Sequence, residues 1–137
     1  MDVDLAVIAD AANVSQEGKL NILGVFDTIW ASTFPFRHSV MVFVLRFSAD
    51  FTEQGSHALE VRLMDADGEQ LFKAEGPLKV MGGVPGRPIR PHVVMGLNGV
   101  TFQRPGDYSF EVMMAGRHMR SVPLHVVQAP TSSKAGP

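Results

Sequence analysis

PGDYSFEVMMAGRHMRSVPLHVV, residues 105–127, contains two alternating apolar segments that are joined through Ala115 and Gly116. In the first segment, alternate positions are large and apolar: Tyr108, Phe110, Val112 and Met114. In the second segment, the matching positions hold Val122, Leu124 and Val126. Successive side chains of a β-strand point to opposite faces, so this period of two predicts a hairpin with one face buried.

Segments of the same kind recur along the chain and are bounded by clusters of Gly, Pro, Asn and Ser. They predict further strands at residues 3–14, 20–26, 39–47, 57–64, 69–80 and 92–99. The segment 39–47 is apolar on both faces, which is typical of a central strand. Asp65 to Gly68 has the composition of a tight hairpin turn, with Gly68 at positive φ.

About eight short strands without a helical pattern predict an all-β fold. We expect an antiparallel β-sandwich of the Greek-key, immunoglobulin-like kind, with a small closed barrel as the alternative. Residues 1–127 would form this single domain. Residues 128–137, QAPTSSKAGP, are small, polar and bounded by proline, and predict a disordered C-terminal tail.

The composition is that of a globular protein, with 45% hydrophobic and 19% charged residues among 137. The absence of cysteine excludes disulfides, thiolate metal sites and a cysteine nucleophile. The first residues, MDVDLAVIAD, are acidic where a signal peptide is basic, and no apolar stretch approaches the ~20 residues of a membrane helix. We therefore expect a cytoplasmic protein that does not bind membranes.

Charge is distributed unevenly, with a net charge of −7 over residues 1–75 and +4 over residues 76–127. This asymmetry would suit head-to-tail assembly if the two halves formed separate surfaces. The alternative, which a sandwich favours, is that early and late strands lie side by side and neutralise each other. A dense basic stripe with interleaved aromatic residues is missing, so no nucleic-acid partner is expected.

Two long segments, VDLAVIADAANVSQEGKLNILGVFDTIWASTFPF and RPGDYSFEV with SVPLHVV, carry a resemblance to a known family. The marks are the Gly18-Lys19-Leu20 turn, the aromatic segment with Asp27, Trp30 and Phe34-Pro35-Phe36, and the closing Pro-Gly-Asp-Tyr hairpin. The chain resembles, from about Met1 to Gln128, a bacterial family of short proteins known only as a domain of unknown function. The resemblance implies a β-sandwich and no catalytic residue.

An aromatic segment, predicted as a loop over residues 27–38, is the first candidate for a binding site. It contains Trp30, the only tryptophan, together with Phe34 and Phe36. Tryptophan and phenylalanine often anchor protein interfaces, so these residues would form a platform for a partner. In the alternative, the loop plugs one open end of the sandwich. Phe34-Pro35 is a candidate for a cis peptide bond.

A basic segment at residues 81–91, MGGVPGRPIRP, is the second candidate. Its prolines are three residues apart, which is the repeat of polyproline II, with Arg87 and Arg90 between them. The segment would form an extended arm for an acidic partner or a second subunit. Alternatively, it is a stiff loop that protects a sheet edge.

Catalytic and metal motifs are missing from the sequence. The turn at Asp65 and Asp67 lacks the later glutamate of a calcium loop. No two histidines have the spacing that places two metal ligands on one strand face, and His118 and His125 would lie on opposite faces of a regular strand. Asp10 and Asp27 lie in apolar surroundings, but short acidic side chains commonly bond nearby backbone amides. We expect no catalytic residue, metal or cofactor.

These patterns favour a non-enzymatic interaction or structural module whose partner is another protein, including a second copy of itself. The residues predicted to carry that interaction are Trp30, Phe34, Phe36, Arg87 and Arg90. The main alternative is a small-ligand binder with an aromatic-lined pocket at the mouth of the sandwich. An enzyme is the third hypothesis, and it would need convergent polar side chains that no motif indicates.

Overall fold

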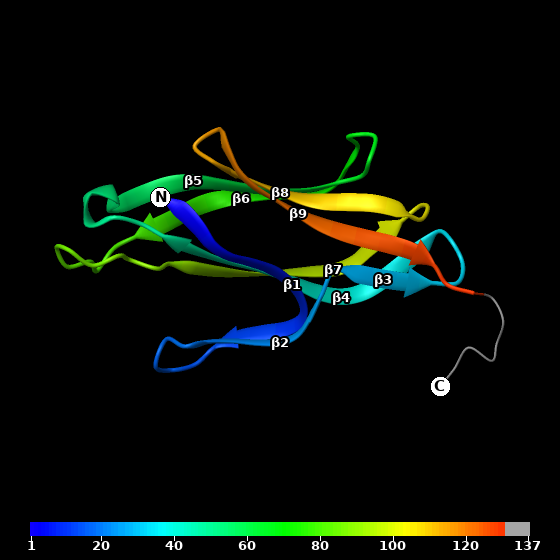
Figure 1. Ribbon diagram of the computed structural model, residues 1–137, viewed down its shortest axis with the longest axis horizontal. Helices are drawn as coiled ribbons and strands as arrows, with labels where there is room; N and C mark the ends of the chain where they lie inside the picture. Colours follow the sequence, from blue (N-terminus) through cyan, green and yellow to red (C-terminus); the bar gives the residue numbers. More distant parts are fainter. Residues whose placement is uncertain (131–137) are drawn as a thin grey trace.

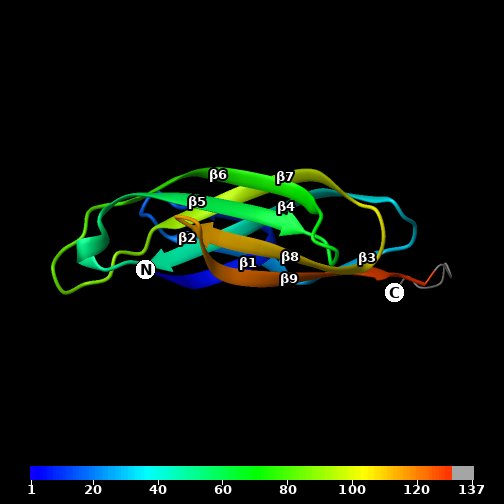
Figure 2. The same cartoon turned by 90° about the horizontal axis from the view of Figure 1, so that it is seen from above.

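A computed structural model describes residues 1–130, which form two β-sheets packed face to face (Figure 1). The first sheet has the strand order β2-β1-β4-β7 and the second has the order β3-β9-β8-β5-β6. The strands run along the long axis of the molecule in both layers (Figure 2). Their bounds are β1 Asp2–Val14, β2 Leu20–Phe26, β3 Thr28–Ala31, β4 Phe36–Ser48, β5 Gly55–Met64, β6 Gln70–Val80, β7 His92–Phe102, β8 Gly106–Met114 and β9 Arg117–Gln128.

The strand order is that of an immunoglobulin-like Greek key. Strands β1-β4-β7 correspond to A-B-E of that fold, and β9-β8-β5-β6 correspond to G-F-C-C′. All pairs are antiparallel except β3 with β9, which is parallel. The sandwich predicted from the sequence is confirmed, and the closed barrel is not formed.

The core lies between the sheets and is made by the alternate residues that the sequence predicts. Tyr108, Phe110, Val112, Met114, Leu124 and Val126 are all buried. Phe43 of β4 and Phe110 of β8 stack across the two layers, with ring centroids 4.3 Å apart and planes 8° apart. Both rings are fully inaccessible to solvent, so this stacked pair joins the sheets at the centre of the sandwich.

A tyrosine corner fixes the entry to β8. The Tyr108 hydroxyl donates a hydrogen bond to the carbonyl oxygen of Arg104, 2.6 Å away and four residues upstream. The ring of Tyr108 also meets Phe102 edge-on, with centroids 4.9 Å apart. Immunoglobulin-like domains use a tyrosine at the start of strand F in the same way, which agrees with the strand correspondence above.

Strand β4 is central, as the apolar segment 39–47 predicts, because β1 and β7 flank it. Val44 points away from the core, yet it is fully buried between its cross-strand neighbours Val7 and Val94. The pairs β4 with β7 and β5 with β8 also place early and late segments of the chain side by side. The two charged halves are thus interleaved rather than separated.

Several strand boundaries differ from the sequence-based expectation, including the start of β4 at Phe36 rather than at residue 39. Residues 28–31 form strand β3 where a loop is expected, so the sandwich has nine strands rather than eight. Strand β7 extends to Phe102, beyond the predicted end at residue 99. Gln128 belongs to β9, and the Ala129 amide donates to the carbonyl of Ala31, so the predicted tail does not begin at residue 128. Its residues 131–137 lie outside the described part of the chain.

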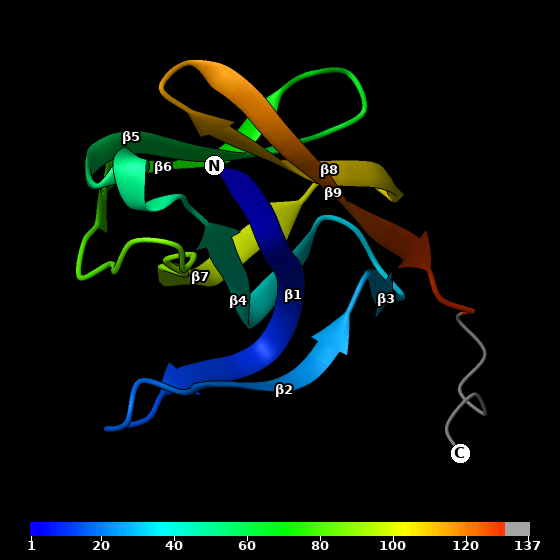
Figure 3. The ribbon, with the colours of Figure 1, turned by 60° about the vertical axis from the view of Figure 1, so that its left-hand side comes forward.

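The β1–β2 hairpin leaves the sandwich at its first sheet. The first half of β1 pairs with β4 and the second half pairs with β2, so the hairpin stands away from the two layers (Figure 3). Gly24 has φ +74°, and a Cβ atom at this position would lie 2.4 Å from the Asp10 carboxylate. A glycine at position 24 therefore leaves room for the Asp10 side chain.

Candidate partner-binding surface

Trp30 lies on the open side of β3. Ile29 and Ala31 are buried because they point into the core, and the alternation of the strand turns Trp30 outward, with 65% of its surface exposed. Parallel pairing with β9 holds the strand in place, and the His125 amide donates to the Asp27 carbonyl at 2.7 Å. A large aromatic side chain is thus displayed on an ordered strand rather than on a loop.

Phe34 and Phe36 are placed differently from Trp30. Both are half-buried and pack against the core cluster, and the bond between Phe34 and Pro35 is cis. The residues of the aromatic segment are therefore not all placed in the same way. Phe34 and Phe36 pack against the core, and of these three aromatic residues only Trp30 is displayed to solvent.

A pocket of about 400 Å³ opens beside Trp30. Its walls include Asp10, Phe26, Thr28, Trp30, Phe36 and His38. The His38 ring lies between Phe26 and Phe36, with ring centroids 6.1 and 6.0 Å away. Its Nε2 atom is buried and has no hydrogen-bond partner. The pocket thus combines aromatic walls with one carboxylate and one imidazole, a composition that can hold part of a partner side chain or a small polar ligand.

Exposed aliphatic side chains extend this surface onto the neighbouring hairpin. Val25 of β2 is also part of the pocket wall and is 60% exposed, and Leu23 on the same strand is 71% exposed. Single exposed apolar residues are normal, but here a tryptophan and two aliphatic residues lie on consecutive strands, β2 and β3. We refer to Leu23, Val25 and Trp30 as the apolar rim.

Arg87 and Arg90 lie elsewhere. The segment 81–91 connects β6 to β7 at the end of the molecule opposite β3 (Figure 1). Residues 84–87 form a turn, in which the Arg87 amide donates to the Val84 carbonyl, so the predicted polyproline II helix is wrong. Arg90 Nε lies 3.5 Å from the Asp4 carboxylate, which also pairs with Arg46. The arginines therefore cannot form one site with Trp30.

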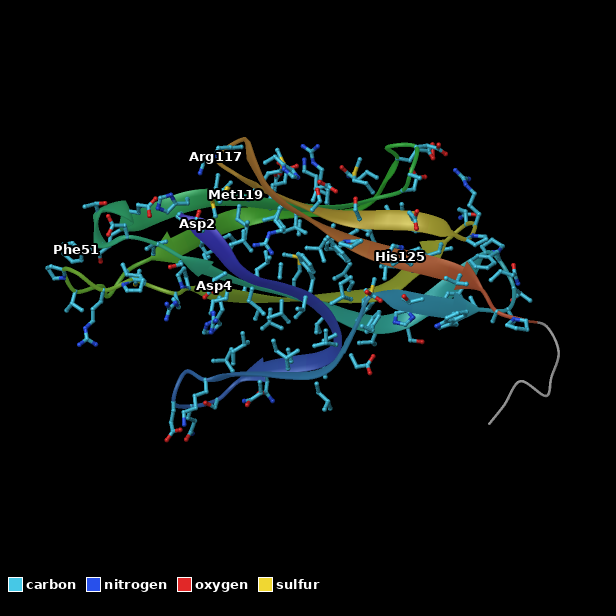
Figure 4. All side chains as sticks on the ribbon, viewed as in Figure 1. Asp2, Asp4, Phe51, Arg117, Met119 and His125 are labelled. Carbon is cyan, nitrogen blue, oxygen red and sulfur yellow. The ribbon has the colours of Figure 1, made fainter. Side chains whose placement is uncertain are left out.

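A polar cluster on the outer face of β8 and β9 was missed by the sequence reasoning. Glu111 accepts hydrogen bonds from Ser109 and Ser121, and His118 Nε2 lies 2.7 Å from its carboxylate. His125 pairs with Asp107 on the same face, where Figure 4 shows it on β9. A register shift between β8 and β9 places both histidines on this outer face, contrary to the prediction for a regular strand.

This cluster does not have the arrangement of a catalytic triad. Ser121 donates directly to the Glu111 carboxylate, and His118 contacts both groups through the same nitrogen, so no histidine relays a proton between them. Burial alone would raise the pKa of Glu111, but the hydrogen bonds from Ser109, Ser121 and His118 outweigh it and lower the pKa. Within residues 1–130, no group of three potential metal ligands is brought together.

Comparison with known proteins places the chain in a family. Residues 4–127 match a family of unknown function, DUF6941. The chain belongs to this family. The family resemblance predicted from the sequence is confirmed for almost the whole chain of this DUF6941 protein. Among curated proteins, none matches the chain. In the described part of the chain, no helix is long and apolar enough to span a membrane.

Two solved structures are similar to the DUF6941 chain at low sequence identity. An immunoglobulin-like protein from Pseudomonas aeruginosa is 19% identical with a TM-score of 0.40, over 92% of this chain and 95% of that one. The alkylpurine DNA glycosylase AlkC from Pseudomonas fluorescens is 10% identical with a TM-score of 0.46. That match covers 88% of this chain but only 30% of the glycosylase. Neither similarity is close enough to indicate a ligand or an activity.

Proposed function

We propose that this DUF6941 protein is a non-enzymatic interaction module that binds a protein partner through the apolar rim and the adjoining pocket. The observation that carries the proposal is the 65% exposure of Trp30 on a strand whose neighbouring residues are buried. Displaying a tryptophan in water sacrifices the free energy of burying a large apolar surface. A partner that covers the side chain recovers that free energy, which is why tryptophan is enriched at interface hot spots.

The pocket supports the same proposal by supplying polar groups beside the apolar rim. The wall includes the polar side chains of Asp10, Thr28 and His38 beside aromatic and aliphatic ones. Interfaces commonly combine an aromatic anchor with a few such groups, which fix the orientation of the partner. A cytoplasmic location stays a prediction of the sequence.

Affinity capture from a bacterial host tests the proposal. The tagged wild-type protein is compared with Trp30→Ala and with the control Met81→Ala, which removes a side chain of similar exposure, 64%, from the 81–91 segment. Specific partners should be retained by the wild type and the control and lost with Trp30→Ala. Equal recovery with all three proteins would contradict the proposed site.

A small ligand is the second candidate, and the pocket of about 400 Å³, whose wall includes aromatic rings, a carboxylate and an imidazole, favours it. A ligand that binds the folded state must raise the melting temperature, and the free energy of stabilisation grows with the logarithm of the ligand concentration divided by its Kd. A thermal-shift screen of polar and aromatic metabolites should then give a stabilising compound whose effect disappears in Trp30→Ala. Compounds that act equally on both proteins would not support a pocket ligand.

A further inference from the structure

Strand β2 leaves one edge of the first sheet open. Within the described chain β2 is hydrogen-bonded only to β1, and the β1–β2 hairpin stands away from the other strands (Figure 3). An open edge presents a row of unpaired backbone N–H and C=O groups. Another extended strand can add to such an edge and satisfy these groups.

Apart from the backbone irregularity at Gly24, where φ is +74°, the β2 edge lacks the features that usually prevent strand addition. Its sequence, LNILGVF, has no charged residue and no proline. Strand β6, an edge of the second sheet, is protected by Pro77 and by Lys73, Glu75 and Lys79. The edge of β7 lies beside β6 of the facing sheet, and β3 has only four residues. Strand β2 is therefore the edge best suited to receive a partner.

We propose that β2 pairs antiparallel with β2 of a second copy of this chain, with Leu23 on the two-fold axis. This inference rests on the proposed function, because it names a second copy as one partner of the module. The directions of the backbone N–H and C=O groups in β2 allow this pairing. The Lys19 carbonyl accepts from the Ser15 amide, so the alternate residues Leu20 and Ile22 direct their backbone groups toward the open edge.

Charge complementarity favours this register over the neighbouring one centred on Ile22. With Leu23 on the axis, Lys19 of each copy would face Asp27 of the partner subunit, one residue beyond each end of the paired strands, which gives two ion pairs. A register centred on Ile22 would instead oppose Glu17 and Asp27, which are both acidic. Lys19 is exposed and its contact in the free chain is a surface pair with Glu17, so it is available to a second copy.

Cysteine cross-linking tests the register directly, because the chain has no cysteine of its own. In the proposed dimer Leu23 faces itself as a non-hydrogen-bonded pair, with Cα atoms about 4.5 Å apart, within reach of a disulfide. Leu23→Cys should form a covalent dimer under mild oxidation at micromolar concentration. Asn21→Cys is the matched control, since it would lie opposite Val25 and should cross-link at least about tenfold more slowly.

Sedimentation equilibrium tests the association itself. The wild type should be dimeric and Leu23→Lys monomeric, with an unchanged melting curve at low concentration because Leu23 is exposed. Lys19→Glu should raise the dimer Kd about tenfold, and adding Asp27→Lys to it should restore the wild-type value. A monomeric wild type, equal cross-linking at positions 21 and 23, or a dimer that survives Leu23→Lys would overturn the inference. If the wild type is monomeric but the Trp30→Ala variant no longer captures a partner that the wild type captures, the proposed function is still supported.

Discussion

The stacked pair of Phe43 and Phe110 gives the sharpest prediction about what holds the two sheets together. Truncation of Phe110 to alanine removes a fully buried ring whose stacking partner belongs to the facing sheet. Removal of a buried phenylalanine costs about 3–5 kcal/mol, because the transfer free energy is lost and a cavity remains. Since both sheets line this site, neither can close the cavity without moving the other.

The expected change in melting temperature follows from the length of the chain. Unfolding entropy is about 2.1 cal/mol/K per residue, so for a chain of this size 1 kcal/mol corresponds to roughly 3.5 °C. Phe110→Ala should therefore lower the midpoint by about 10–17 °C. Chemical denaturation followed by circular dichroism, together with calorimetry, measures both quantities.

A double-mutant cycle shows whether the stacking itself contributes. Phe43→Ala should cost a similar amount, and the double variant should cost less than the sum by about 1 kcal/mol or more, because the rings interact and share one cavity. If the doubly truncated protein does not fold, the leucine variants at both positions give the same cycle at smaller cost. A loss below about 1 kcal/mol for Phe110→Ala would refute the placement of this ring at the centre of the core.

Two further predictions concern pH. Burial raises the pKa of Tyr108, the only tyrosine, so its neutral form is favoured by the fold and stability should fall as pH rises above about 10. Ultraviolet titration of the phenol should show the raised pKa. The Tyr108→Phe variant should have a free energy of unfolding about 1 kcal/mol lower at neutral pH, and its stability should no longer fall at alkaline pH. The hydrogen bonds to Glu111 lower its pKa in the folded protein. The ionised carboxylate therefore contributes its full stabilisation above about pH 4.5, and this contribution is lost as pH falls through the lowered pKa. Acid unfolding of Glu111→Gln should depend less on pH in that acidic range, and an unchanged slope would contradict the bonding at Glu111.

The fold could be predicted because burial imposes a period of two on the strands. Phe110 and Leu124 are buried because they occupy the inward-facing alternate positions of their strands. Gly68 has the positive φ that its turn requires. Strand β3 could not be predicted in the same way. It has only four residues and pairs with β9, nearly a hundred residues later, so no local pattern records the partner that makes it a strand.

The candidate site was predicted only in part, for a related reason. The rarity of tryptophan pointed to Trp30, but whether a large aromatic residue is buried or displayed depends on which face its strand turns to the core. Trp30 points outward, whereas Phe34 and Phe36 pack inward. The pairing of His118 with Glu111 depends on a register shift between β8 and β9, which the regular alternation of the sequence conceals.

Fluorescence quenching of Trp30 tests the proposed binding surface most directly, because this residue is the only tryptophan and its signal needs no label. In the free protein, a neutral quencher such as acrylamide should reach the side chain as readily as its 65% exposure implies. Addition of the captured partner should protect the Trp30 fluorescence from the quencher. A protein that the Trp30→Ala variant still captures should give no such protection. A tryptophan shielded in the free protein, or equally accessible with the partner bound, would contradict the proposed surface.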